Sequence, residues 1–193
     1  MMELQLIDVI LFIALFPLHS YISLIVHECG HYLGAIFMKA ESKKIVASLS
    51  EKKFYVRFNF GRKPTRTEDI IISIAGPMAQ LLLILIFIMQ PYLIALKLVA
   101  IAYLPMVFRH LIPSKGSDGQ FIQNVLPNQQ QVIYKKLSYT LYSFVFLFSI
   151  LYFQLTIVNN PEYTMWTIAL LTILALPFWW KLLRPYYAKV VRV

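Results

Sequence analysis

Apolar residues occur in long stretches along this chain, and polar residues gather in the short segments between them. A helix needs about 20 mostly apolar residues to cross a bilayer. Five stretches meet this length, and we assign transmembrane spans to residues 18–38, 70–89, 92–111, 137–158 and 164–183. Residues 4–16 are also apolar, and we expect Pro17 to kink the helix and leave them as an interfacial lead-in before the first span. The pattern predicts an all-α polytopic membrane protein.

A different pattern occupies the segment between the first two predicted spans. Apolar side chains at Phe54, Val56 and Phe58 alternate with more polar residues, which is the two-residue period of a β-strand with one apolar face. Residues 45–49 can form a partner strand. We therefore expect a small β-hairpin over residues 44–60, on the same side of the membrane as the loop that contains it.

The composition agrees with this reading. Hydrophobic residues make up 59% of the 193 residues and charged residues only 14%, whereas a soluble domain carries about 45–50% and about 25%. Cys29 is the only cysteine, which excludes a disulfide within the chain. We expect a single membrane-embedded domain over residues 1–193, with a core at 18–125 and additional helices at 137–183.

The positive charge is distributed unevenly. The chain has 18 Lys and Arg residues and a formal net charge of +9, and half of these basic residues lie within residues 39–66. Short loops rich in Lys and Arg stay in the cytoplasm. We therefore expect the N-terminus outside, and the 39–66 loop and the C-terminus in the cytoplasm. This topology signal accounts for the charge, so the expected partner is the lipid bilayer and not nucleic acid. The Lys- and Ile-rich composition favours a bacterial cell membrane.

The first span contains ionisable residues that are costly in hydrocarbon. His27 and His31 are four residues apart, so a helix places them on one face about one turn from each other. This spacing lets two imidazoles bind one zinc ion, with Glu28 beside them as a general base for water. Ionisable residues within a membrane usually serve a function. The alternative is a buried polar contact between helices.

A catalytic zinc site takes three protein ligands and leaves one position open. Cys29 faces away from His27 on the helix and is a poor third ligand. Asp118 follows the third span and lies on the same predicted membrane side as His31. A simple loop turn at Asp118 and Gly119 stays open as the alternative on local grounds.

Three motifs, in this order, resemble those of the site-2 protease family of intramembrane zinc metalloproteases. They are His27–His31, Ile74–Pro77, and Pro113 with Asp118–Gly119 five residues later. The resemblance covers roughly residues 20–125. It implies that Asp118 is the third ligand of one zinc ion per chain and that Glu28 is the catalytic base.

Two positions depart from the family pattern. Gln80 stands where the family usually has Asn, and His110 stands at another position where Asn is common. We assign Gln80 to substrate contact and leave open whether His110 takes part in catalysis. Phe54, Val56 and Phe58 are also assigned to substrate binding, because an open strand edge can pair with an unwound substrate. A hairpin that only caps the helices is the alternative.

The resemblance implies an intramembrane zinc endopeptidase that cleaves a membrane-anchored protein or a precursor peptide in or near its transmembrane segment. The chain leaves no room for the PDZ or CBS domains of larger relatives, so substrate choice falls to the membrane core, the 39–66 loop or a regulatory membrane partner. The alternatives are a metal-binding transport or adaptor subunit without peptidase activity, and a membrane peptidase of another family, such as a prenyl-protein protease. One cluster of polar groups without a visible repeat favours the hydrolase over the transporter.

Overall fold

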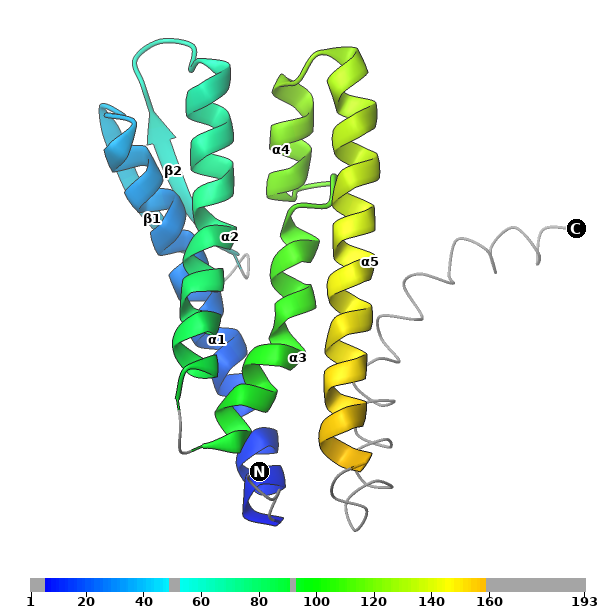
Figure 1. The fold of residues 1–193 in the computed structure, drawn as a ribbon. Coiled ribbons are helices and arrows are strands. Elements are labelled where there is room, and N and C mark those ends of the chain that lie inside the picture. The colour runs from blue at the N-terminus through cyan, green and yellow to red at the C-terminus, as the bar shows by residue number, and fades with distance from the viewer. Residues whose placement is uncertain (1–5, 49–52, 91–92, 159–193) are drawn as a thin grey trace, which may run out of the picture.

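The computed structural model describes residues 6–48, 53–90 and 93–158. In chain order these form α1 (Leu6–Phe37), β1 (Ser42–Ser48), β2 (Lys53–Asn59), α2 (Arg66–Ile88), α3 (Ile94–His110), α4 (Asp118–Val125) and α5 (Asn128–Val158). The four long helices α1, α2, α3 and α5 run alongside one another, and the short α4 lies toward the same end of the bundle as the hairpin (Figure 1). The architecture is mostly helical, with one small sheet.

Three of the described helices are long and apolar enough to cross a membrane. They are α1 over Ile7–Phe37, α2 over Arg66–Ile88 and α5 over Asn128–Leu155. The third predicted span is also a helix, α3, but its 17 residues reach only about 25 Å, short of a hydrocarbon core of about 30 Å. The fifth predicted span, residues 164–183, lies outside the described residues. Three such helices indicate a membrane protein, and they fall short of the five spans predicted.

The predicted separation of residues 4–16 from the first span is not seen, because α1 continues through Pro17 as one helix of 32 residues. Proline is tolerated inside membrane helices when neighbouring helices support the backbone. Here α1 packs on both sides of Pro17: before it, Phe12 is buried against Leu98 of α3, and after it the His19 ring meets the Tyr103 ring, with centroids 4.7 Å apart. Residues before Pro17 are therefore part of the bundle, and they do not form a separate interfacial segment.

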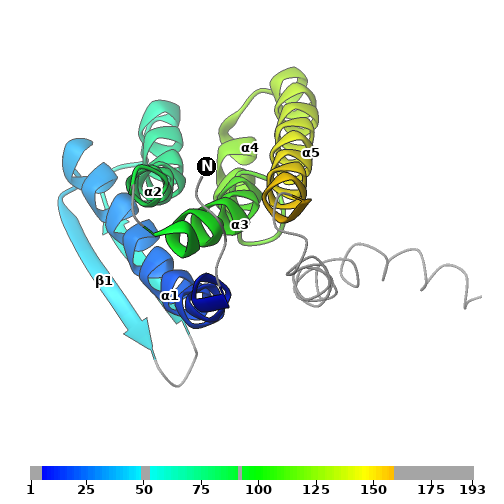
Figure 2. The same cartoon turned by 60° about the horizontal axis from the view of Figure 1, so that its bottom comes forward.

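The predicted β-hairpin is present. β1 pairs with β2 in antiparallel register, with Ser42 opposite Asn59 and Ile45 opposite Val56. In Figure 2 the hairpin runs beside α1, on the side of α1 that faces away from α5. The strands therefore bring β2 next to the helix that carries the histidine pair.

The segment after α3 differs from the loop that the sequence analysis expected. Ser117 caps α4 by accepting a hydrogen bond from the Gln120 N–H at 3.2 Å. The next helix, α5, begins at Asn128, where the Gln131 N–H donates to the Pro127 carbonyl at 3.0 Å. The first turns of α5 are polar, so the apolar stretch at 137–158 does not indicate that the helix begins at Asn128.

The buried centre of the bundle is α3, which contacts α1, α2 and α5. Its small apolar residues Val99, Ala100 and Val107 are fully buried. Near one end of the bundle, Phe12 of α1 meets Phe153 of α5 edge to face, with ring centroids 6.0 Å apart. The segment that follows α3 reaches α1 and α2, where Asp118 lies beside His27 and His31.

Candidate metal centre

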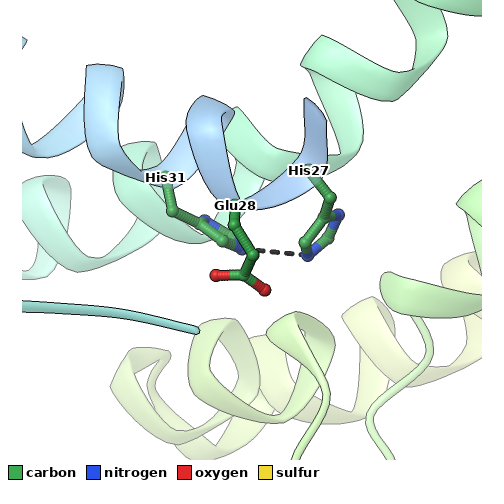
Figure 3. Close-up of side chains that lie close together, drawn as sticks. All are labelled: His27, Glu28 and His31. Atoms are coloured by element: carbon green, nitrogen blue, oxygen red, sulfur yellow. Dashed lines mark hydrogen bonds between the residues drawn. The ribbon is translucent and has the colours of Figure 1, made fainter. Parts of the chain in front are cut away.

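The two histidines of α1 face each other. His27 Nε2 lies 3.0 Å from His31 Nε2, and both rings are buried (Figure 3). The opposite ring nitrogens are already paired: His31 Nδ1 lies 2.7 Å from the Ile72 carbonyl oxygen, and His27 Nδ1 lies 3.0 Å from Gln80 Oε1. Because both oxygens only accept hydrogen bonds, each Nδ1 donates and carries the proton. In the neutral rings the two Nε2 lone pairs therefore point into the same small space.

The orientation of the Gln80 amide follows from its contacts with Ser23. Gln80 Nε2 donates to the Ser23 hydroxyl at 2.9 Å and to the Ser23 carbonyl at 3.2 Å, and this turns Oε1 toward His27. Both side chains are fully buried. An oxygen acceptor on one ring nitrogen fixes the tautomer of a metal-binding histidine. Ser23 and Gln80 together keep His27 Nε2 free to bind a metal.

Asp118 brings a carboxylate to the same space from α4. Its Oδ2 lies 3.1 Å from His27 Nε2, and its Oδ1 lies 3.2 Å from His31 Nε2. Asp118 is the first residue of α4, directly after the capping residue Ser117. Both carboxylate oxygens therefore face the nitrogens on which a metal ion would bind.

The three side chains fit a zinc ion. Zinc binds histidine nitrogen and carboxylate oxygen at about 2.0–2.2 Å, so two ligand atoms of a tetrahedral site lie about 3.3–3.5 Å apart. The three distances among the two Nε2 atoms and the Asp118 oxygens are 3.0, 3.1 and 3.2 Å. Asp118 Oδ2 is buried without a hydrogen-bond partner among the described residues, and a cation would satisfy it. Two imidazoles and a carboxylate leave the fourth position open, as catalytic zinc sites do.

Two glycines allow the helices to approach this closely. A Cβ at Gly76 of α2 would lie 2.5 Å from His31 Nε2 and 2.9 Å from His27 Cε1. A Cβ at Gly119 of α4 would collide with the backbone of Leu111, just after α3. Both glycines belong to the motifs found in the sequence. Gly76 lets α2 approach the two histidines, and Gly119 lets the start of α4, which carries Asp118, lie against the end of α3.

Glu28 extends from α1 toward the space between the two histidines (Figure 3). Ligand atoms of Glu28, His27 and His31 lie within 4.8 Å of one another. The Glu28 Oε2 accepts a hydrogen bond from the backbone N–H of Val56 at 3.0 Å. The carboxylate is thus close enough to exchange a proton with a water molecule in this space, and β2 holds it there.

A cavity of about 660 Å³ opens onto this cluster. The walls come from α1, α2, β2 and α4, together with His110 at the end of α3. The apolar part of the wall includes Leu24, Val56, Phe58 and Phe121. A largely apolar cavity with a few converging polar groups is typical of a ligand-binding site.

The predicted site residues are distributed as follows in the structure. The residues assigned to metal binding and to base catalysis lie together: His27, Glu28, His31 and Asp118. Two residues assigned to substrate contact line the cavity: Val56 and Phe58. Gln80 is different, because it is buried against His27 and Ser23 and is not part of the cavity wall. Phe54 belongs to β2, but its side chain lies outside the described part of the structure.

The groups that orient the histidines and Glu28 were not predicted from the sequence. Ile72 accepts from His31 through its backbone carbonyl, and Val56 donates to Glu28 through its backbone N–H, and backbone atoms leave no signal in a sequence. Ser23 did leave one, since a serine one turn before His27 lies on the same helix face. His27, His31 and Asp118 thus form a candidate metal centre, with the Glu28 carboxylate and the cavity beside it. No protein-family model matches the chain, and no curated protein or solved structure is significantly similar to it.

Proposed function

We propose that this protein is an intramembrane zinc endopeptidase, similar in activity to the site-2 proteases that its motifs resemble. The observation that carries the proposal is that the Nε2 atoms of His27 and His31 lie 3.0 Å apart. Each Nε2 presents a lone pair, because the Nδ1 of the same ring donates its proton to an oxygen acceptor. Two such lone pairs repel each other unless a cation lies between them. The Asp118 carboxylate beside the pair completes a ligand set for one divalent ion.

The residues have separate roles in the proposed reaction. His27, His31 and Asp118 hold the zinc ion, which when bound supplies a Lewis acid that activates water and polarises the scissile carbonyl. Glu28 takes one proton from the water molecule as the water oxygen bonds to the carbonyl carbon. It passes that proton to the amide nitrogen as the C–N bond breaks, and this releases a free acid and a free amine.

The position of the site supports a substrate within a membrane. His27 and His31 lie roughly 9–15 Å along the helix from the end of α1 at Phe37. Non-helical segments at such depth are tolerated only where they are buried in protein or line a cavity with water. The cavity beside the site provides that environment for both the attacking water and an unwound substrate.

The hairpin offers a way to hold the unwound substrate. In an antiparallel pair, the N–H groups of a strand point alternately toward the partner and away from it. Because the Val56 N–H points to Glu28, it points away from β1. This edge of β2 borders the cavity, and an extended peptide can pair with it by strand addition.

The test is cleavage by purified protein in lipid vesicles. The wild type and Glu28→Gln are loaded with zinc and mixed with a set of transmembrane peptides that carry a fluorophore and a quencher. We expect the wild type to cleave at least one peptide and Glu28→Gln to bind zinc but cleave none, because the variant keeps the ligands and loses the base. A wild type that binds zinc and cleaves nothing would favour the metal-binding transport or adaptor subunit.

A further inference from the structure

His110 is a polar side chain of the cavity wall that the reaction described above does not use. It is the last residue of α3, and its ring lies against the ring of His27, with centroids 4.4 Å apart and an angle of 35° between the planes. The His110 side chain remains 37% exposed. One part of the ring therefore packs on a metal ligand, while another part is accessible from the cavity.

The distances separate His110 from the metal ligands. Its Nδ1 lies 3.9 Å from Asp118 Oδ2, whereas His27 Nε2 lies 3.1 Å from the same oxygen. The longer distance exceeds both a hydrogen bond and the separation of about 3.3–3.5 Å expected between two ligands of one zinc ion. His110 thus lies just outside the triangle formed by the ligand atoms of His27, His31 and Asp118, which we call the ligand triangle.

His110 and Glu28 flank different sides of that triangle. Glu28 groups with His27 and His31, whereas His110 groups with His27 and Asp118. A carbonyl group attacked in this space would therefore have the base on one side and an imidazole on the other. A neutral imidazole always keeps one N–H, and it can donate this proton in a hydrogen bond without changing its charge.

We propose that His110 is a further catalytic residue, which donates a hydrogen bond to the substrate carbonyl oxygen as that oxygen gains negative charge. The proposal rests on the proposed peptidase function. Donors placed in advance where negative charge develops stabilise the transition state strongly, because they need no reorganisation during the reaction. His110 suits this role, since its position at the end of a buried helix and against His27 fixes the ring.

The test compares three substitutions in the full-length, zinc-loaded protein. His110→Phe keeps a ring against His27 but removes the N–H, and His110→Ala removes both. His110→Asn places an amide N–H near the position of Nδ1. For each variant the zinc affinity, kcat, KM and the affinity for a phosphinic peptide, whose tetrahedral anion mimics the attacked carbonyl, are measured.

We expect zinc affinity close to that of the wild type in all three variants. In His110→Phe and His110→Ala, kcat should fall about 10²–10³-fold, the usual loss for one such donor, with little change in KM. Affinity for the phosphinic peptide should fall with kcat, and His110→Asn should recover a clear part of both. A purely structural role would not produce this difference between the Phe and Asn variants.

Other outcomes overturn the proposal. Loss of zinc binding in His110→Phe would make His110 a metal ligand, and wild-type kcat in that variant would reduce it to a packing residue. An Asn variant no better than the Phe variant would exclude hydrogen-bond donation. If the wild type neither cleaves peptides nor binds the phosphinic peptide, the peptidase function fails and this inference fails with it. If the wild type cleaves peptides and the His110 variants cleave them equally well, the inference fails and the peptidase function stands.

Discussion

The backbone N–H of Val56 donates a hydrogen bond to Glu28 Oε2 at 3.0 Å. This contact joins a strand of the hairpin to the proposed catalytic base. It also uses the very N–H group that an extended substrate would need when it pairs with the open edge of β2. A substrate strand at this edge competes with Glu28 for the Val56 N–H, so substrate binding and the freedom of the carboxylate are linked in the proposed reaction.

The same contact indicates where proline should interfere with the substrate. Residues two apart in a strand share an edge, so the N–H of Phe58 points to the cavity side and that of Arg57 points toward β1. Phe58→Pro removes one donor from the open edge. We expect it to lower kcat/KM about fivefold relative to Phe58→Ala, which removes the side chain alone, because one hydrogen bond contributes about 1 kcal/mol.

The control for this experiment is Arg57→Pro, which removes a bond between the two strands and should disorder the hairpin. Backbone hydrogen exchange in β1 distinguishes the two proline variants: protection should persist in Phe58→Pro and disappear in Arg57→Pro. Equal cleavage by Phe58→Pro and Phe58→Ala would mean that the hairpin only caps the helices.

Removing the carboxylate ligand should abolish tight metal binding. Asp118→Ala leaves two imidazoles, and we expect zinc affinity to fall by more than the 10–100-fold that loss of an outer partner costs. Glu28→Gln is the matched control, because it also removes a buried carboxylate yet should retain one zinc ion per chain. Zinc content after dialysis against a chelator measures both. Wild-type zinc content in Asp118→Ala would place the third ligand elsewhere.

Substitution of Gln80 should lower the affinity for zinc and leave the binding of substrate unchanged. Its Oε1 accepts from His27 Nδ1 at 3.0 Å, and Gln80→Leu leaves that N–H without its acceptor in a buried place. We expect the zinc affinity to fall about 10–100-fold, and Ser23→Ala to have a smaller effect, because Ser23 acts only through the Gln80 amide. Competition with a zinc chelator measures both. A variant Gln80→Leu with unchanged zinc affinity and a raised KM would instead support the substrate contact predicted from the sequence.

A methyl group at Gly76 should disturb the site directly. Its Cβ would lie 2.5 Å from His31 Nε2, so the ring must move or α2 must shift away from α1. We expect Gly76→Ala to lower the free energy of unfolding by about 1–3 kcal/mol, as overpacking does, and to weaken zinc binding. Ser73→Ala, on the same helix one turn earlier, is the control and should do neither. Normal zinc binding by Gly76→Ala would show that the ligand rings tolerate displacement.

The histidine pair of this site could be predicted from the sequence, because the four-residue spacing of His27 and His31 follows the helix repeat. His27 and His31 are adjacent on one face of any α-helix, whatever surrounds that helix. The contacts of Gln80 could not be predicted in the same way. Whether a side chain reaches a histidine or a cavity depends on how α1 and α2 pack, and local patterns do not specify that packing.

The hairpin and the helix ends show the same limit. The alternation at Val56 and Phe58 indicates that the two residues share a face, but not which edge of the strand pairs with β1. The apolar stretch at 137–158 also did not predict that α5 begins at Asn128. A helix can extend beyond the membrane with polar residues on its surface. Pro17 was expected to set residues 4–16 apart from the first span, but packing around it keeps the residues on both sides in one helix.

Labelling of single cysteines in intact cells tests the predicted orientation. Half of the 18 basic residues lie within residues 39–66, and short basic segments remain in the cytoplasm. Ser42 and Gln90 are both exposed, in β1 and just after α2 respectively, so a cysteine at either position is accessible. On a Cys29→Ala background we expect an impermeant thiol reagent to label Gln90→Cys in intact cells, and Ser42→Cys only after the cells are opened. The reverse pattern would put the hairpin and the cavity beside the proposed metal centre outside the cell, and substrates would then have to be sought there.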